Sequence, residues 1–232
     1  MSGRWWLLPG TLCTAEVFGP LLEVLAVPPG QCRSVRLDRP AVEDYAAELA
    51  DVQDGDIMLG FSLGAILAAH HLDRMRARAV VLIAANPFAD TPEKSAARLD
   101  QMARISAQGP GPVMAAAWPA LVGPAARANP DLGDRIVAMA EETVRDLPAQ
   151  TDLALGRPGA EAMLASAASP VLFITGRDDR TAPPDRAMRA AAIGGHELVL
   201  VDGAGHFLPL EAPQACAEAI RTFLLGRRQD CR

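Results

Sequence analysis

The chain has 232 residues, half of them hydrophobic, so it is long enough to bury a substantial core in a single domain. Its formal net charge of -6 at pH 7 gives no basic surface for nucleic acid or anionic lipid, and we expect neither as a partner. The longest apolar stretch, 79–85, is far shorter than a membrane span. The apolar run 5–8 ends at Pro9 and is too short for a secretory signal. We therefore expect a cytoplasmic protein.

Four cysteines occur in the sequence, and no two of them form a Cys-x-x-Cys pair. They are Cys13, Cys32, Cys216 and Cys231. Their spacing to the four histidines fits no zinc pattern, so we expect no metal site. Unpaired thiols in a reducing compartment are favoured over disulfides.

Short apolar runs alternate with longer helical patterns along the chain. The predicted strands, in chain order, are 4–8, 34–37, 57–61, 79–84, 171–175 and 197–201. Each is apolar on both faces and bounded by Gly, Pro, Asp or Asn, as expected of strands that helices cover on both sides. The predicted helices between them are 17–25, 42–52, 65–74, 184–192 and 213–224. This alternation predicts an α/β fold with a mostly parallel sheet and helices on both faces.

The alternation is interrupted once, between residues 84 and 171. No strand-like run occurs there, and the apolar residues follow a helical pattern over 95–107, 113–121, 135–145 and 160–167. A structureless loop of this length is implausible in a compact domain. We therefore predict that residues 88–165 form a helical cap, inserted in a core made of residues 1–87 and 166–232.

Residues 60–64 read Gly-Phe-Ser-Leu-Gly, at the point where the predicted strand 57–61 gives way to a helix. A sharp strand-to-helix turn forces the residue at its tip into left-handed torsions and brings the flanking segments close together. Glycine is then needed two residues before and two residues after the tip. Such a turn would expose the hydroxyl of Ser62 above a helix N-terminus, which favours developing negative charge. The pattern predicts a nucleophile, provided that a base and an acid lie nearby.

A serine hydroxyl needs a base to become a useful nucleophile, and four histidines are available. His70 and His71 fall along the helix after Ser62 and point away from its N-terminus, which favours surface or packing roles. His196 precedes the last predicted strand and should lie at the wrong end of the sheet. His206 follows that strand in a glycine-rich loop at the carboxyl end. It is either a solvated loop histidine or the base, and we favour the base.

The acid that orients the base is expected after the predicted strand 171–175, where Asp178 and Asp179 lie in a turn. One of the two would orient His206, while the other would stabilise the turn. The residues alone leave this choice open. The chain order Ser, Asp, His, each at the carboxyl end of its own strand, is typical of one fold.

The motifs "LLPGTLC", "GFSLG", "ITGRDDRTAPP" and "DGAGHFLPLEAPQ" together resemble the α/β-hydrolase superfamily, in its small, cap-bearing, esterase-like branch. The resemblance covers nearly the whole chain. It implies that the acid is Asp179, because the family places this residue three positions after the glycine that ends the strand, here Gly176, with a proline downstream. It also implies an oxyanion hole formed by the backbone N–H groups of Thr11 and Leu63.

The sequence departs from the family pattern in two places. The usual His-Gly of the oxyanion loop is Pro9-Gly10 here, which still leaves the backbone N–H groups available. The first predicted strand corresponds to the third strand of the family, so the antiparallel hairpin of the family is expected to be absent or reduced.

The resemblance implies a serine hydrolase that cleaves a carboxylic ester of a small to medium apolar substrate through an acyl-enzyme, without a metal or organic cofactor. Phe88, Trp118 and Phe207 are the expected substrate-binding residues. No strong basic cluster marks a phosphate or carboxylate site, although Arg98, Arg104 and Arg127 could reach such a ligand. A thioesterase, a lactonase, a C–C bond hydrolase or lyase as in menaquinone synthesis, and a non-catalytic ligand-binding protein remain alternatives. The oligomeric state cannot be read from the sequence.

Overall fold

The computed structural model describes residues 3–229, and the side chains of residues 3–226. Its strands form one sheet in the order β2-β1-β3-β4-β5-β6, and every neighbouring pair is parallel. The strands are β1 (Trp5–Leu8), β2 (Cys32–Ser34), β3 (Ile57–Phe61), β4 (Ala79–Ile83), β5 (Val171–Gly176) and β6 (Glu197–Val201). The predicted α/β class and parallel sheet are thus confirmed. The described residues contain no antiparallel hairpin beside β2.

Register places apolar side chains in rows on both faces of the sheet. Leu7 pairs with Leu59, and Leu59 pairs with Val81, and all three lie in one core cluster. The residues one position earlier in each strand point to the opposite face and lie in a second cluster. This explains why β1, β3 and β4 carry no polar side chain at any position instead of alternating.

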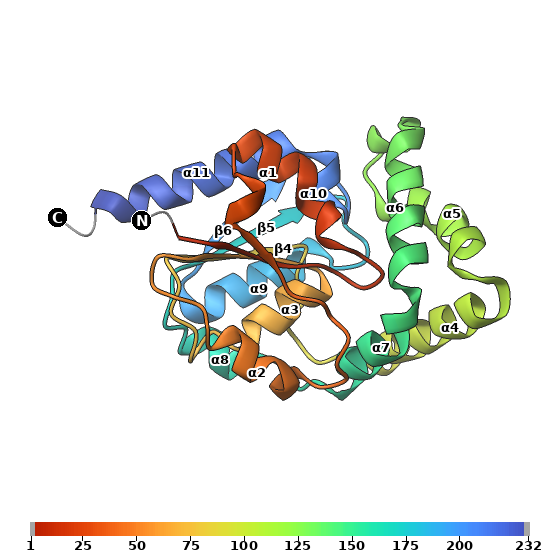
Figure 1. Cartoon of the computed structure of the whole chain (residues 1–232), viewed down its shortest axis with the longest axis horizontal. Helices are drawn as coiled ribbons and strands as arrows, with labels where there is room; N and C mark the ends of the chain where they lie inside the picture. Colours follow the sequence, from red (N-terminus) through yellow and green to blue (C-terminus); the bar gives the residue numbers. More distant parts are fainter. Residues whose placement is uncertain (1–2, 230–232) are drawn as a thin grey trace.

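Helices cover both faces of the sheet (Figure 1). The helices α1 (Gly19–Leu25), α10 (Leu208–Glu211) and α11 (Pro213–Gln229) lie on one face. The helices α2 (Ala46–Leu49), α3 (Leu63–Ala69), α8 (Glu161–Ala165) and α9 (Pro184–Gly194) lie on the other. Short 3₁₀ turns occur at Ala15–Phe18, Pro29–Gln31, Val42–Tyr45, Ala126–Ala128 and Val144–Asp146.

The second strand was predicted two residues too late. The pairing with β1 runs from Cys32 to Ser34, and only the N–H of Val35 continues it, by donating to the carbonyl of Leu7 at 2.9 Å. Val35 and Leu37 are nevertheless almost fully buried, at 0% and 2% exposure. Their apolar character reflects burial in the core cluster that also contains Leu49 of α2, not strand pairing.

Helix boundaries also differ from the prediction, most clearly in two helices. The helix predicted over 65–74 begins two residues earlier, directly after Ser62, and ends at Ala69. The helix predicted over 42–52 is a 3₁₀ turn followed by the short α2. Ends of helices are the least predictable part of a helical pattern, because frayed turns keep the same periodicity.

The span between β4 and β5 forms α4 (Pro92–Gln108), α5 (Pro110–Leu121), α6 (Pro130–Thr143) and α7 (Leu147–Gly156), followed by α8. A proline stands in the first turn of each of the four, where its missing N–H costs nothing. Figure 1 shows α4 to α7 grouped beyond the carboxyl ends of the strands. Sequence periodicity missed α7. The predicted cap, 88–165, includes α8, but α8 packs on α9 at the sheet. The cap boundary at residue 165 stays a prediction.

Cys13, Cys32 and Cys216 are free thiols, and Cys231 lies outside the described residues. Within residues 3–229 no helix combines the length and the apolar character that crossing a bilayer demands.

Candidate active site

Ser62 stands between the last residue of β3 and the first residue of α3. Its backbone has φ 49° and ψ -113°, a conformation that residues other than glycine rarely adopt. A Cβ added to Gly60 would lie 2.5 Å from the Cα of Ala65, and one added to Gly64 would lie 2.0 Å from the carbonyl oxygen of Leu8. Both glycines are therefore required by close backbone approach, and the tight turn predicted from the sequence is present.

The imidazole of His206 links the other two predicted residues. Its Nε2 lies 3.0 Å from the Oγ of Ser62, and its Nδ1 lies 2.8 Å from Oδ2 of Asp179. His206 is 5% exposed and Asp179 is 2% exposed, so this chain of contacts is shielded from solvent. Asp178 is exposed, and its side chain makes no hydrogen bond or ion pair with His206 among the described residues. The structure thus brings Ser62, His206 and Asp179 together, and leaves Asp178 outside the group.

The second oxygen of Asp179 is held by the backbone. Oδ1 accepts hydrogen bonds from the N–H groups of Thr181 and Ala182, each at 2.8 Å. These bonds fix the plane of the carboxylate and leave Oδ2 for His206 alone. Such a bond favours the tautomer that carries its proton on Nδ1, so that Nε2 can accept a proton from Ser62.

A buried glutamate, which the sequence reasoning missed, positions the loop that carries His206. One oxygen of Glu211 accepts the N–H groups of Gly205 at 2.8 Å and of Gly123 at 2.7 Å. The N–H of His206 itself donates to the carbonyl of Leu121 at 2.7 Å. Burial raises the pKa of the Glu211 carboxyl above its ordinary value, against the effect of these hydrogen bonds. The end of α5 is thereby fixed to the histidine loop.

The loop after β1 lies against the nucleophile. A Cβ added to Gly10 would lie 3.1 Å from the Cβ of Ser62, which shows how closely this loop approaches it. Thr11 lines the cavity described below, and Leu63 is the first residue of α3, where helix geometry leaves the N–H without an intrahelical partner. Both N–H groups are thus on segments that adjoin Ser62. Their role in binding an oxyanion stays a prediction.

A glutamine from the inserted helices holds the same loop. Oε1 of Gln150, on α7, accepts the N–H of Leu12 at 3.0 Å, and the contact is buried. Leu12 has φ 56°, so its backbone adopts a strained conformation that this bond helps to maintain. Nearby, Arg36 donates two hydrogen bonds to Asp146, at 2.9 and 2.6 Å, and joins the inserted helices to the sheet. Sequence spacing gave no signal for either contact.

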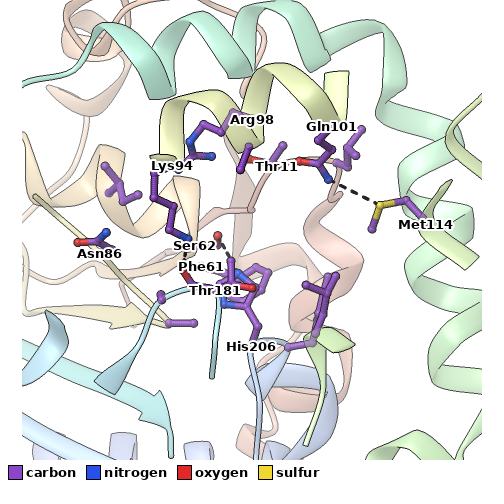
Figure 2. Close-up of a pocket in the computed structure, with 17 residues that line it drawn as sticks. Thr11, Phe61, Ser62, Asn86, Lys94, Arg98, Gln101, Met114, Thr181 and His206 are labelled. Atoms are coloured by element: carbon purple, nitrogen blue, oxygen red, sulfur yellow. Dashed lines mark hydrogen bonds between the residues drawn. The ribbon is translucent and has the colours of Figure 1, made fainter. Parts of the chain in front are cut away.

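Ser62 and His206 open into a cavity of about 220 Å³, shown in Figure 2. This volume is below the range of roughly 300–1,000 Å³ typical of pockets for drug-sized ligands. The larger apolar side chains of the wall are Leu12, Phe61, Ile66, Met114, Leu121 and Phe207. The cavity therefore fits a small molecule with an apolar portion.

Only one of the three predicted substrate-binding residues lines this cavity, namely Phe207. Phe88 is 5% exposed and packs in the core cluster below the sheet, with the guanidinium of Arg189 4.2 Å from its ring centre. Trp118 packs on α6, where a Cβ at Gly133 would lie 2.5 Å from its ring. Aromatic character alone could not tell core positions from wall positions.

The remaining histidines lie outside the cavity. His70 is buried, and desolvation together with the charge of Arg157 lowers its pKa to about 4. His71 and His196 contact the carbonyls of Val42 and Leu164. Surface or packing roles were predicted for His70 and His71, and the burial of both side chains fits packing. No group of three or more possible metal ligands occurs among the described residues.

The comparisons with known proteins assign this fold to a family. The model of the alpha/beta hydrolase family matches residues 7–219, and the chain belongs to that family. No curated protein matches the sequence.

Solved structures of similar fold extend over nearly the whole chain. One is a thermophilic esterase from Thermogutta terrifontis, with 22% identity, 97% of this chain and 91% of that chain covered, and a TM-score of 0.78. A carboxylesterase structure from Nitrososphaera gargenis has 18% identity, coverage of 99% and 92%, and a TM-score of 0.80. The enol-lactonase from Burkholderia xenovorans LB400 has 17% identity, coverage of 97% and 92%, and a TM-score of 0.80. At these identities the likeness concerns the fold.

Proposed function

We propose that the protein is a serine hydrolase that cleaves a carboxylic ester of a small, partly apolar substrate through an acyl-enzyme. One observation carries this proposal, namely the continuous contact from Ser62 Oγ through His206 to Asp179, at 3.0 and 2.8 Å. A nucleophile, a base and an orienting acid within hydrogen-bond reach are what acyl transfer needs. The wall of the adjoining cavity and its small volume set the size of the substrate.

The proposed reaction proceeds in two acyl transfers. Ser62 Oγ attacks the ester carbon while His206 Nε2 takes the serine proton, and Asp179 stabilises the imidazolium that forms. The N–H groups of Thr11 and Leu63 donate to the oxygen that becomes negative, a contribution of about 3–4 kcal/mol for a donor of this kind. His206 then gives the proton to the leaving alcohol. Water, activated by the same imidazole, hydrolyses the acyl-enzyme and restores Ser62.

The proposal is tested with a fluorophosphonate probe and a series of p-nitrophenyl esters of increasing acyl length. We expect covalent labelling of Ser62 in the native protein and none in Ser62→Ala. Because the cavity is small, kcat/KM should be highest for short acyl chains and fall as the chain lengthens. A native protein that neither reacts with the probe nor turns over any ester would contradict the proposal and favour a ligand-binding role. Parallel thioester and lactone series distinguish the alternative hydrolases on this scaffold.

A further inference from the structure

The α4 side of the cavity carries two cationic side chains, Lys94 and Arg98, one helical turn apart. Figure 2 shows Lys94 reaching from α4 toward Ser62 and Thr181, with Arg98 above it on the same helix. Lys94 is the only lysine in the sequence, all other basic residues being arginines. An ordinary ester has no group that calls for a cation in the wall, so this pair requires another explanation.

The cations at and behind this wall outnumber the carboxylate that pairs with them. Asp90 is shared between Arg98, whose Nε lies 2.5 Å from Oδ2, and Arg157, whose Nη2 lies 2.8 Å from Oδ1. The Arg157 side chain is fully buried, so its positive charge needs Asp90 as a counter-ion. Burial raises the pKa of Asp90, but the hydrogen bonds from the two arginines outweigh it and hold the pKa below its ordinary value. One carboxylate thus serves three cations when Lys94 is included.

Lys94 itself is bound to a neutral group. Its Nζ donates to the carbonyl of Thr181 at 2.5 Å, and no ion pair of Lys94 occurs among the described residues. Two carboxylates act on Lys94 from a distance, and both are already engaged. Asp90 pairs with Arg98 and Arg157, and Asp179 accepts hydrogen bonds from His206 and two backbone N–H groups. Burial lowers the pKa of Lys94, and the charge of Arg98 adds to this. A half-buried cation without a counter-ion is costly unless a ligand supplies the missing charge.

We propose that Lys94 and Arg98 form a carboxylate subsite, and that the substrate is a small ester with a free carboxylate on its acyl or its alcohol half. The assignment of the scissile ester rests on the proposed function of Ser62, whereas the subsite itself does not. The guanidinium of Arg98 uses Nε on Asp90, so its terminal N–H groups are available for the planar fork that a carboxylate accepts. In a cavity of about 220 Å³, a carboxylate adds little bulk to a short ester.

The kinetic test uses two pairs of substrates that differ only in charge. The pair 4-acetoxybenzoate and 4-acetoxybenzamide carries the charge on the alcohol half. Phenyl hydrogen glutarate and the phenyl ester of glutaramic acid carry it on the acyl half. In one of the two pairs we expect kcat/KM to be at least about tenfold higher for the anionic ester than for its neutral partner, as charge-assisted hydrogen bonds provide. The pair that shows this difference identifies whether the carboxylate belongs to the alcohol half or to the acyl half of the substrate.

Variants on α4 identify the residues responsible. Lys94→Gln and Arg98→Gln should each lower kcat/KM for the preferred anionic substrate by about tenfold more than for its neutral partner. Arg104→Gln is the matched control, because Arg104 lies on the same helix, pairs with Asp100 and is half exposed. This variant should leave both substrates unchanged. Equal losses for charged and neutral substrates in the first two variants would mean that they act on the fold.

Binding is measured separately from turnover. Calorimetric titration of the native protein with 4-acetamidobenzoate and with 4-acetamidobenzamide, and with glutarate and glutaramide, uses compounds that Ser62 does not cleave. We expect tighter binding of a carboxylate by about tenfold or more, lost in Lys94→Gln and Arg98→Gln. Preferential carboxylate binding without ester turnover would refute the proposed hydrolase and leave the subsite intact. Absence of a carboxylate preference in both assays would overturn the subsite.

Discussion

Replacing Asp179 by asparagine should reverse the tautomer of His206. The N–H groups of Thr181 and Ala182 both donate to Oδ1, so an asparagine must place its carbonyl oxygen there. Its NH₂ group then occupies the position of Oδ2, 2.8 Å from His206 Nδ1, and donates a hydrogen bond to that nitrogen. The imidazole proton moves to Nε2, where it faces Ser62 and blocks proton abstraction. In a protease triad the same change lowers kcat by about 10⁴, equivalent to about 5.4 kcal/mol.

The assay compares Asp179→Asn and Asp178→Asn on one short p-nitrophenyl ester at pH 7. Both changes remove one negative charge from the same turn, but Asp178 is exposed and the carboxylate bonded to His206 is that of Asp179, so the Asp178 variant should retain activity within about threefold. Denaturant unfolding of both variants checks that neither loses its fold. If Asp178→Asn is inactive while Asp179→Asn works normally, the orientation argument is wrong.

Three further changes probe the same site. Ser62→Ala should lower kcat by more than about 10³ with little loss of stability, measured as the unfolding midpoint in urea, since among the described residues its Oγ makes a hydrogen bond only with His206. Appreciable residual turnover would exclude Ser62 as the nucleophile. Gln150→Ala should lower kcat by about tenfold with KM nearly unchanged, because the N–H of Leu12 loses its acceptor. Gln150→Glu keeps an acceptor oxygen, so its kcat should be close to that of the native protein. Glu211→Ala should destabilise the fold by about 2–4 kcal/mol by leaving two buried N–H groups, one of them on Gly205, without acceptors. Burial raises the folded-state pKa of Glu211, so this carboxyl contributes its full stability below its ordinary pKa and less as the pH rises through the folded value. The native protein should therefore exceed Glu211→Gln in unfolding free energy by a margin that shrinks from pH 4.5 toward pH 7.

The parts of the site that the sequence predicts are those set by local geometry. The turn at Ser62 follows from two glycines and an adjoining apolar strand, because close backbone approach is a property of the segment itself. His206 follows from its place after the last strand, since the carboxyl ends of parallel strands meet at one edge. The choice of Asp179 over Asp178 required the family pattern, because both residues suit a turn equally well.

The parts that the sequence does not predict depend on contacts between distant segments. Gln150 meets Leu12 across 138 positions, and Glu211 meets Gly123 across 88. No periodicity carries such information. For the same reason, apolar character placed Phe88 in the substrate site when it belongs to the core. The excess of positive charge around Lys94 likewise depends on Asp90 pairing with two arginines, one of which is 67 positions away in the chain.

The presence of one lysine, placed at the cavity wall, makes the site spectroscopically addressable. Reductive methylation with ¹³C-formaldehyde modifies amines but not guanidinium groups and preserves the positive charge. In this chain it would give one side-chain methyl resonance, from Lys94, beside that of the terminal amine. Burial keeps the pKa of Lys94 below its ordinary value, so this resonance would titrate at lower pH than that of an exposed lysine. Its chemical shift would then report, from a single atom group, whether the cavity is empty or holds an anion.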